Sequence, residues 1–285
     1  MLDNASNFLT IDVEEWFEAE IIWARQSIEP VLNSILPNQI DVFLRVCNKH
    51  GIKATCFISG KIADRFPDLV RRLSEDGHEI ASHSYDHRLV YTKTQDQFRE
   101  DLRRSVGKLE SITSKKILGY RAPSWSVNSS VSDWFYAVLH EVGLAYSSSV
   151  YPAKTYLYGM PEAPSIVHRI PQCGIVEIPQ QLLSIGPCKF GFAGGAFMRI
   201  LPAFIVKKAI KHKNEQGKCV FIYVHPWELI EVKHDVKLTY FEHFIQTHGI
   251  KNNEKKLNSI CKQFSNTFVR MGDFVSEMLA KRSLQ

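Results

Sequence analysis

Two carboxylates follow an apolar run near the start of the chain. Residues 8–13 (FLTIDV) predict a buried strand, and Asp12 and Glu14 leave the same side of its extended backbone, whereas Glu15 points the other way. Two carboxylates on one face need a cation or hydrogen-bond donors close by. The pattern indicates either a site for a cation and proton transfer or the charged start of a loop.

Two histidines follow another apolar run. His83 and His87 stand four residues apart in HSYDH (83–87), after HEIAS. On one helical turn both imidazoles would face the same way, which suits a shared divalent metal. A third ligand must come from elsewhere, and Glu14 or Asp12 is the candidate. Two histidines and one carboxylate are typical of a catalytic zinc or iron site with open positions.

Two further polar clusters also follow predicted strands. Arg121 in GYRAPSWS (119–126) can hold a carboxylate in its guanidinium fork; the alternative is a surface arginine. His225 in YVHPWE (223–228) follows the most apolar strand of the chain, and Pro226 ends that strand. This favours exposure of His225 at the rim of the fold over a buried core histidine.

Strands and helices of 10–18 residues alternate along the chain, which is typical of parallel βαβ units. Thr94 and Gln97 form a capping box at the start of the clearest helix. We expect one α/β domain over residues 1–285, an incomplete or distorted (β/α)7-type barrel with loop elaboration at about 147–200 and C-terminal helices at about 240–285. The predicted strands are 8–13, 53–59, 78–83, 116–121, 144–148, 175–179 and 219–224, and the predicted helices are 39–50, 67–76, 94–112, 130–142, 202–215 and 251–264.

Composition excludes several classes of protein. The chain has 285 residues, 45% hydrophobic and 23% charged, which is too apolar for a disordered chain. Because no apolar run approaches 18 residues, we predict no membrane span. The six cysteines show no CxxC and the N-terminus shows no secretory signal, so we expect reduced thiols in the cytoplasm.

The net charge of +5 is unevenly spread. Residues 207–218 carry five lysines against Glu215, and residues 251–285 carry seven Lys or Arg against three acids. These stretches are either solvated helix faces or a face for an anionic partner: an acidic polymer, a phosphate-linked sugar or a membrane surface, with at most peripheral membrane contact. Since no aromatic residues interleave with a basic stripe, we expect no nucleic-acid partner.

The motifs TIDVEE, HSYDH, GYRAPSWS and YVHPWE, in this order, resemble the polysaccharide deacetylase family with its NodB homology domain. The resemblance is to members encoded at exopolysaccharide and O-antigen loci, with DVEEWF and HPWE motifs. It also takes in residues 176–179, the loop 191–202 and the C-terminal helices, and so spans nearly the whole chain. Two departures stand out: Asp-Val-Glu replaces the adjacent aspartates of many relatives, and Ser147 stands where close relatives have Asp.

The resemblance implies a NodB-like barrel that removes an N-acetyl group from an acetamido sugar of a bacterial surface polysaccharide or its precursor, with a divalent metal, zinc by our choice. It implies an oxyanion-stabilising backbone N–H near residues 120–122. Tyr120, Trp125 and Trp227 are the candidate sugar contacts, with core packing as the alternative for the tryptophans. The implied roles are catalytic base for Asp12, metal ligands for Glu14, His83 and His87, support of the base for Arg121, and catalytic acid for His225.

Two alternatives stay open. One keeps the fold and metal but hydrolyses a non-sugar amide or cyclic imide, as allantoinase-like relatives do. The other is an inactive carbohydrate-binding homologue. A glycosidase is disfavoured, because Asp12 and Glu14 on one strand cannot flank a glycosidic bond from opposite sides. The sequence leaves open the particular sugar, whether it is anionic or lipid-linked, and whether the chain forms a homo-oligomer.

Overall fold

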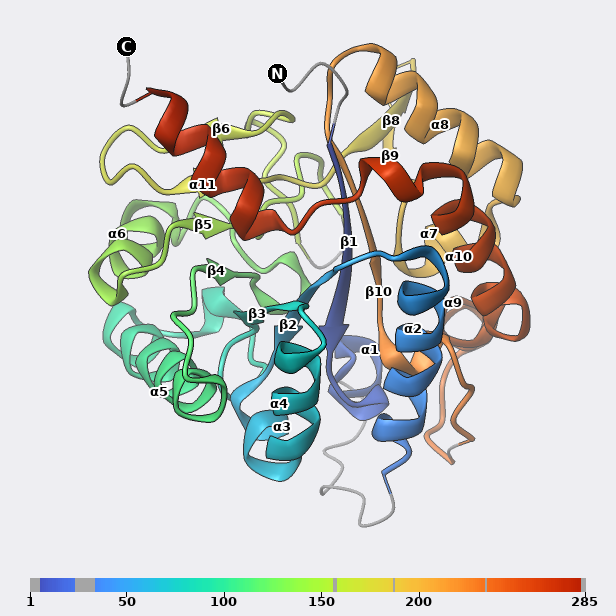
Figure 1. Ribbon diagram of the computed structural model, residues 1–285, viewed down its shortest axis with the longest axis horizontal. Helices are drawn as coiled ribbons and strands as arrows, with labels where there is room; N and C mark the ends of the chain where they lie inside the picture. The colour runs from blue at the N-terminus through green and yellow to red at the C-terminus, as the bar shows by residue number, and fades with distance from the viewer. Residues whose placement is uncertain (1–5, 24–33, 156–157, 187, 234, 283–285) are drawn as a thin grey trace.

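Short apolar strands form one curled, mostly parallel sheet in the computed structural model of the protein (Figure 1). The structure describes residues 6–23, 34–155, 158–186, 188–233 and 235–282. The strand order is β10-β1-β2-β3-β4-β5-β7-β6, with only β6 antiparallel to its neighbour. The strands of this sheet are β1 (Asn7–Val13), β2 (Thr55–Ile58), β3 (Glu79–Ser82), β4 (Gly119–Tyr120), β5 (Tyr146–Ser147), β6 (His168–Arg169), β7 (Val176–Glu177) and β10 (Val220–Val224). The edge strands β10 and β6 do not pair with each other, so the curled sheet is an incomplete barrel, as predicted.

Helices surround the outer face of the sheet from α5 and α6 on one side to α8 and α10 on the other (Figure 1). The predicted helices are all present, and the capping box of Thr94 and Gln97 starts α5. The helices are α1 (Glu20–Trp23), α2 (Leu36–His50), α3 (Gly60–Arg65), α4 (Pro67–Glu75), α5 (Gln95–Thr113), α6 (Ser132–Val142), α7 (Gly195–Ile200), α8 (Ala203–Glu215), α9 (Tyr240–Thr247), α10 (Ile250–Phe264) and α11 (Met271–Arg282).

Alternation along β1 separates two apolar clusters. Leu9, Ile11 and Val13 pack outward against the surrounding helices. Phe8 belongs to the second cluster, in the barrel interior, with Phe57, Phe221 and other aromatic residues. Since side chains alternate across a strand, Thr10 and Asp12 share the inward side with Phe8. The inward series therefore begins apolar and becomes polar toward the carboxyl end of the strand.

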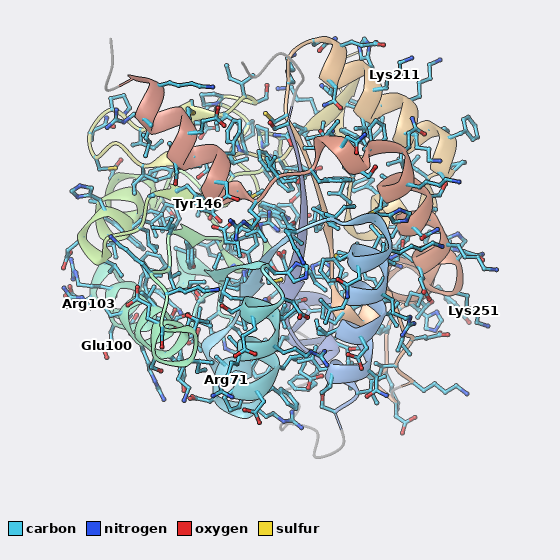
Figure 2. The ribbon with its side chains drawn as sticks, in the orientation of Figure 1. Arg71, Glu100, Arg103, Tyr146, Lys211 and Lys251 are labelled. Atoms are coloured by element: carbon cyan, nitrogen blue, oxygen red, sulfur yellow. The ribbon has the colours of Figure 1, made fainter. Side chains whose placement is uncertain are left out.

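The amino-terminal end of the barrel is closed by α11, which lies at the upper left of the molecule in Figure 1. The backbone N–H of Met271 donates to Thr55 Oγ1 at 3.0 Å, and that of Gly272 donates to Glu79 Oε2 at 2.9 Å. Tyr146, labelled left of the centre in Figure 2, donates its hydroxyl to Glu79 from inside the barrel. With this end filled, space for a ligand remains at the carboxyl ends of the strands, as in other barrels.

The segment between β7 and β10 crosses the open side of the barrel. It contains the hairpin of β8 (Leu182–Ile185) and β9 (Cys188–Gly191), which the sequence pattern did not predict. Gln180 N donates to Val150 O at 2.9 Å, and Tyr223 N donates to Ala193 O at 3.1 Å, so backbone bonds join the segment to both sides. This segment includes the later part of the stretch 147–200, for which loop elaboration is expected from the sequence. The six cysteines are free thiols. No helix in the described part of the chain combines the length and apolar character needed to cross a membrane.

Candidate active site

Asp12 and Glu14 reach the carboxyl end of the barrel from β1 and the residue after it. Both are almost fully buried, at 4% exposure each. Together with His83 and His225 they line an open cavity of about 200 Å³. The structure thus brings together the first, second and fourth polar clusters of the sequence at one place.

Arg121 is fully buried inside the barrel, and it is no surface arginine. Its Nη1 donates to Asp12 Oδ1 at 2.6 Å and to Thr10 Oγ1 at 2.9 Å. Its guanidinium carbon lies 4.0 Å from the ring centroid of Phe57 and 4.8 Å from that of Phe221. Buried charge is tolerated here because a carboxylate, hydroxyl groups and aromatic faces surround it. The Asp12 carboxylate is thereby fixed in one orientation.

The loop 83–87 is not a turn of helix, so the local prediction was wrong although the two imidazoles do meet. Ser84 and His87 have positive φ angles of 65° and 57°, which an α-helix does not allow. The loop is held by the N–H groups of Gly60 and Lys61 at the start of α3, which donate to the carbonyls of Ser84 and Tyr85. The tight loop, and not helical spacing, turns both rings inward.

Glu14, His83 and His87 form a donor set that fits a metal ion. Their ligand atoms all lie within 4.8 Å of one another. The two Nε2 atoms are 3.2 Å apart, and Glu14 Oε2 is 2.5 Å from His87 Nε2 and 3.7 Å from His83 Nε2. His83 Nδ1 lies 2.8 Å from the carbonyl oxygen of Arg121. Since that carbonyl can only accept, Nδ1 carries the proton and Nε2 presents its lone pair to the other donors, which is the arrangement of a metal-bound histidine.

Charges around Glu14 overcome the effect of its burial. Burial disfavours the carboxylate, but the positive charges of His87 and His225 favour it more strongly. The pKa of Glu14 consequently lies well below its usual value. Glu14 is therefore a carboxylate at neutral pH, the form that a metal requires.

His225 sits at the cavity rim beside Trp227. The two rings stack at 5.0 Å between centroids and 12° between planes, and the indole Nε1 of Trp227 donates to Glu14 Oε1 at 3.3 Å. His225 Nε2 lies 3.9 Å from the same oxygen. Burial alone would lower the pKa of His225, but the charges of Glu14 and Glu228 outweigh it and raise the pKa to about 9.

Glu228 fixes the other side of the His225 ring. Its Oε2 lies 3.1 Å from His225 Nδ1 and accepts the backbone N–H of His225 at 2.9 Å. Its Oε1 accepts from Arg199 Nε at 2.7 Å, and this ion pair is buried. Arg199 also donates to the carbonyls of Ile245 and His248. A continuous chain of bonds therefore connects His225 through α7 to α9.

Ser147 belongs to a second polar network, on the far side of Arg121. Its hydroxyl donates to Ser149 Oγ at 2.9 Å, and Ser149 Oγ accepts the backbone N–H of Ala122. Glu177, opposite Ser147 in the parallel register, accepts the N–H groups of Ser149 and Val150. Arg121 meets this network directly, because its Nη2 donates to Ser148 Oγ at 3.1 Å. A buried carboxylate is thus present next to the serine, on β7.

The three candidate sugar contacts have different surroundings. Trp125 and Trp227 line the cavity, although both are mostly buried. Tyr120 points outward and is fully buried between Phe98 and Phe135 under the helices, so its side chain cannot reach a ligand. It alternates with Arg121 on the strand, and only the arginine faces inward.

The backbone near Tyr120 is also engaged. Arg121 N donates to Ser82 O at 2.9 Å, and Ala122 N donates to Ser149 Oγ at 2.9 Å. The expected oxyanion-binding N–H groups at residues 121 and 122 are therefore committed to other acceptors.

Sequence reasoning missed Glu228 and Arg199. Glu228 carried a local signal, since a carboxylate three residues after His225 forms a capping box in the short 3₁₀ helix Pro226–Glu228. Arg199 carried none, because its partner lies 29 residues away in the sequence.

Comparisons with known proteins agree with this geometry. Residues 30–146 match the family model described as polysaccharide deacetylase, and residues 148–275 match a domain of unknown function, DUF3473. The chain is 28% identical over 148 residues to the peptidoglycan-N-acetylmuramic acid deacetylase PdaA of Bacillus subtilis (strain 168). That alignment covers 42% of this chain and 54% of the relative, so the chain spans about half the length of this curated relative.

Two solved structures share the fold. A putative polysaccharide deacetylase from Mycobacterium smegmatis superposes with a TM-score of 0.63 at 17% identity, covering 99% of this chain and 93% of that one. Puue allantoinase superposes with a TM-score of 0.65 at 16% identity, covering 96% and 89%. At these identities the likeness shows the fold alone. The match over residues 30–146 is the finding that identifies this stretch, which contains His83, His87 and Arg121, with the polysaccharide deacetylase family.

Proposed function

We propose that this protein is a metal-dependent hydrolase that removes the acetyl group from an acetamido sugar. The observation that carries the proposal is that Asp12, which the buried Arg121 holds, and His225, which Glu228 holds, line the same cavity as the Glu14 and His83 members of the donor set. Hydrolysis of an amide needs a base for the attacking water and an acid for the leaving nitrogen. Asp12 in β1 and His225, directly after the adjacent strand β10, supply these two groups.

Asp12 takes the proton of the attacking water. Arg121 holds Oδ1 of Asp12 and so fixes the direction of the carboxylate. His225 donates a proton to the leaving amine from Nε2, because Glu228 engages Nδ1 and the stacked Trp227 ring fixes the imidazole plane. Proton transfers of this kind are worth about 10²–10⁴-fold in rate.

Glu14, His83 and His87 would hold the divalent metal, and we propose zinc. Two imidazoles and one carboxylate are the ligands of many catalytic zinc sites. When bound, such an ion supplies Lewis-acid polarisation of the acetyl carbonyl and a more acidic water. Metal content measured on the protein as purified, and again after chelation, identifies the ion.

The substrate we propose is an N-acetylated sugar of a bacterial surface polysaccharide or of its precursor. The resemblance of DVEEWF and HPWE to exopolysaccharide-locus deacetylases supports this choice, as does the cavity with Trp125 and Trp227 in its lining. We propose that the reaction takes place in the cytoplasm on a precursor, and fractionation of the producing cells tests this placement.

The test is acetate release from a short β-1,4-linked N-acetylglucosamine oligomer by the zinc-loaded protein. We expect Asp12→Asn to reduce the rate about 10²–10⁴-fold, since an amide cannot act as the base. The matched control is Asp68→Asn, because Asp68 is an exposed aspartate that pairs with Arg71 on its own helix. Zinc content and unfolding curves of both variants show whether the site and the fold are kept.

Three outcomes would count against the proposal. Full activity after chelation would show that the reaction needs no metal. Full activity of Asp12→Asn would show that Asp12 is not the catalytic base. Opening of a cyclic imide without acetate release from any acetamido sugar would favour the non-sugar amidohydrolase. Oligosaccharide binding without turnover in the presence of zinc would favour an inactive carbohydrate-binding homologue.

A further inference from the structure

Three neighbouring helices on one flank of the molecule expose large apolar side chains (Figure 1). They come from α7, from the start of α8 and from α9, and Phe204, Tyr240 and Phe241 are 70%, 99% and 74% exposed. We call this set the aromatic flank; it consists of Phe197, Ile200, Phe204, Tyr240, Phe241 and Phe244. Clustered exposure of this kind marks an interaction surface, whereas a single exposed apolar residue does not.

The helix α9 is amphipathic in the reverse sense. Its buried residue is the polar Gln246, while Tyr240, Phe241 and Phe244 are exposed. At 100° per residue these three aromatic positions fall on the side opposite Gln246. A helix on the surface of a globular protein normally turns its aromatic side chains toward the core. The sequence of α9 therefore fits an apolar environment outside the protein.

The aromatic flank is joined to the active site. Ala196 and Arg199 of α7 and Ile245 and Gln246 of α9 line the cavity. Arg199 holds the carbonyls of Ile245 and His248, and it also holds Glu228 beneath His225. The same two helices thus form a wall of the cavity with one face and carry the exposed aromatic residues on the other.

Positive charge surrounds this flank. Of the 35 Lys and Arg residues and 30 Asp and Glu residues of the chain, 12 and 6 fall between residues 199 and 262. This stretch thus carries a net +6, more than the +5 of the whole chain. Lys208 and Lys211 follow Phe204 by four and seven residues on the exposed face of α8, and the exposed Lys251 is the second residue of α10, four residues after the end of α9. Figure 2 shows Lys211 and Lys251 pointing outward on this side of the molecule.

We propose that the aromatic flank docks onto the surface of a lipid bilayer that contains anionic headgroups. Aromatic side chains enter the boundary between headgroups and acyl chains, while flanking lysines meet the lipid phosphates. Docking on this flank brings the cavity wall formed by α7 and α9 to the membrane. If the proposed function holds, this favours an acetamido sugar carried on a membrane lipid over a free oligosaccharide.

Charge complementarity favours a bilayer over a protein partner or a second copy of the chain. The interfaces between proteins are depleted in lysine, whereas here lysines border the aromatic residues on two helices. A second copy would place two positively charged flanks against each other. An anionic lipid surface satisfies both the aromatic and the charged side chains.

The test is co-sedimentation of the full chain with vesicles of phosphatidylcholine alone or mixed with phosphatidylglycerol, which needs no turnover and is therefore independent of the proposed activity. We expect binding to the mixed vesicles and weaker binding to the neutral ones, decreasing as salt rises from about 0.1 to about 0.5 M. Phe241→Ser with Phe244→Ser should weaken partitioning about tenfold or more. Lys208→Gln with Lys251→Gln should weaken it about 25-fold, at roughly fivefold for each lysine.

Matched controls lie away from the flank. Ile166→Ser changes an exposed apolar residue near β6, and Lys116→Gln changes an exposed lysine before β4. Both should bind vesicles as the parent does, and unfolding curves confirm that all variants are folded. The proposal is overturned if the parent does not bind mixed vesicles at about 0.1 M salt. It is also overturned if the flank variants bind normally, or if they abolish a dimer, seen by sedimentation velocity, that forms without lipid.

Discussion

Replacing Glu228 by Gln tests whether the buried carboxylate beneath His225 both stabilises the fold and positions the ring. One of its oxygens accepts a hydrogen bond from Arg199 Nε, and the other accepts from the backbone N–H and from Nδ1 of His225. A glutamine offers only one acceptor oxygen there, and its NH₂ group would face a donor. One of these donors would be left without an acceptor in a buried place.

The magnitude follows from the pKa of Glu228. Burial disfavours its charge, but His225 and Arg199 outweigh burial and lower the pKa from 4.5 to about 2. A difference of about 2.5 units corresponds to roughly 3 kcal/mol. Because the folded-state pKa is the lower one, this stabilisation is complete at neutral pH and is lost as the pH falls from about 4.5 through about 2. Removing one partner of a buried ion pair typically costs about 3–5 kcal/mol, which agrees.

Urea unfolding at pH 7 measures the first effect, and steady-state acetate release measures the second. We expect Glu228→Gln to lose about 3 kcal/mol of unfolding free energy and to lower kcat more than it changes KM, because the mispositioned His225 acts in the chemical step. Glu231→Gln, three residues later and exposed, is the matched control. An unfolding free energy within about 0.5 kcal/mol of the parent, together with an unchanged kcat, would refute the reasoning.

Three further results are expected. Glu14→Gln should lower the zinc content of the purified protein, because a neutral amide is a poorer ligand; normal zinc content measured by elemental analysis would exclude Glu14 as a ligand. Burial and the charge of Lys53 lower the pKa of His78 to about 4 in the folded protein. As the pH falls below 6.5, His78 therefore binds a proton in the unfolded chain before it does so in the folded one. Stability should then decline by about 3 kcal/mol between pH 6.5 and 4, and His78→Asn should not show this part of the decline in pH-dependent unfolding. Gly119→Ala should destabilise the fold by about 1–3 kcal/mol, since its Cβ would come within 2.1 Å of the Tyr146 ring; an unchanged thermal midpoint would contradict this.

The regular elements could be predicted because their signals are local. The helix after Thr94 begins at its capping box, and β1 follows from an apolar run of the right length. The convergence of Asp12, His83 and His225 at the carboxyl ends of the strands followed from the barrel itself. The small strands β6, β8 and β9 gave no such signal, since their pairing depends on partners and not on their own residues.

The finer geometry depends on contacts that spacing does not encode. Tyr120 and Arg121 are neighbours, and only the position of the helices decides that the tyrosine is buried while the arginine faces Asp12. The loop 83–87 depends on backbone bonds to α3, so an i, i+4 spacing suggested a helix where the chain makes a tight turn with positive φ angles. The Arg199–Glu228 pair required knowledge of how α7 packs.

The two family-model matches meet inside the sheet, at Ser147 of β5. The pairing of β4 with β5 lies before that boundary. Two pairings cross it: β5 pairs with β7, and β1, near the start of the chain, pairs with β10. The Arg121 guanidinium, from the first stretch, is held by Ser148 of the second. A chimera of two homologues joined at residue 147 would therefore pair strands from different parents at two places in the sheet. It would also take Asp12 and Arg121 from one parent and His225 from the other. We expect such a chimera to fold only where the two parents have compatible residues at these contacts.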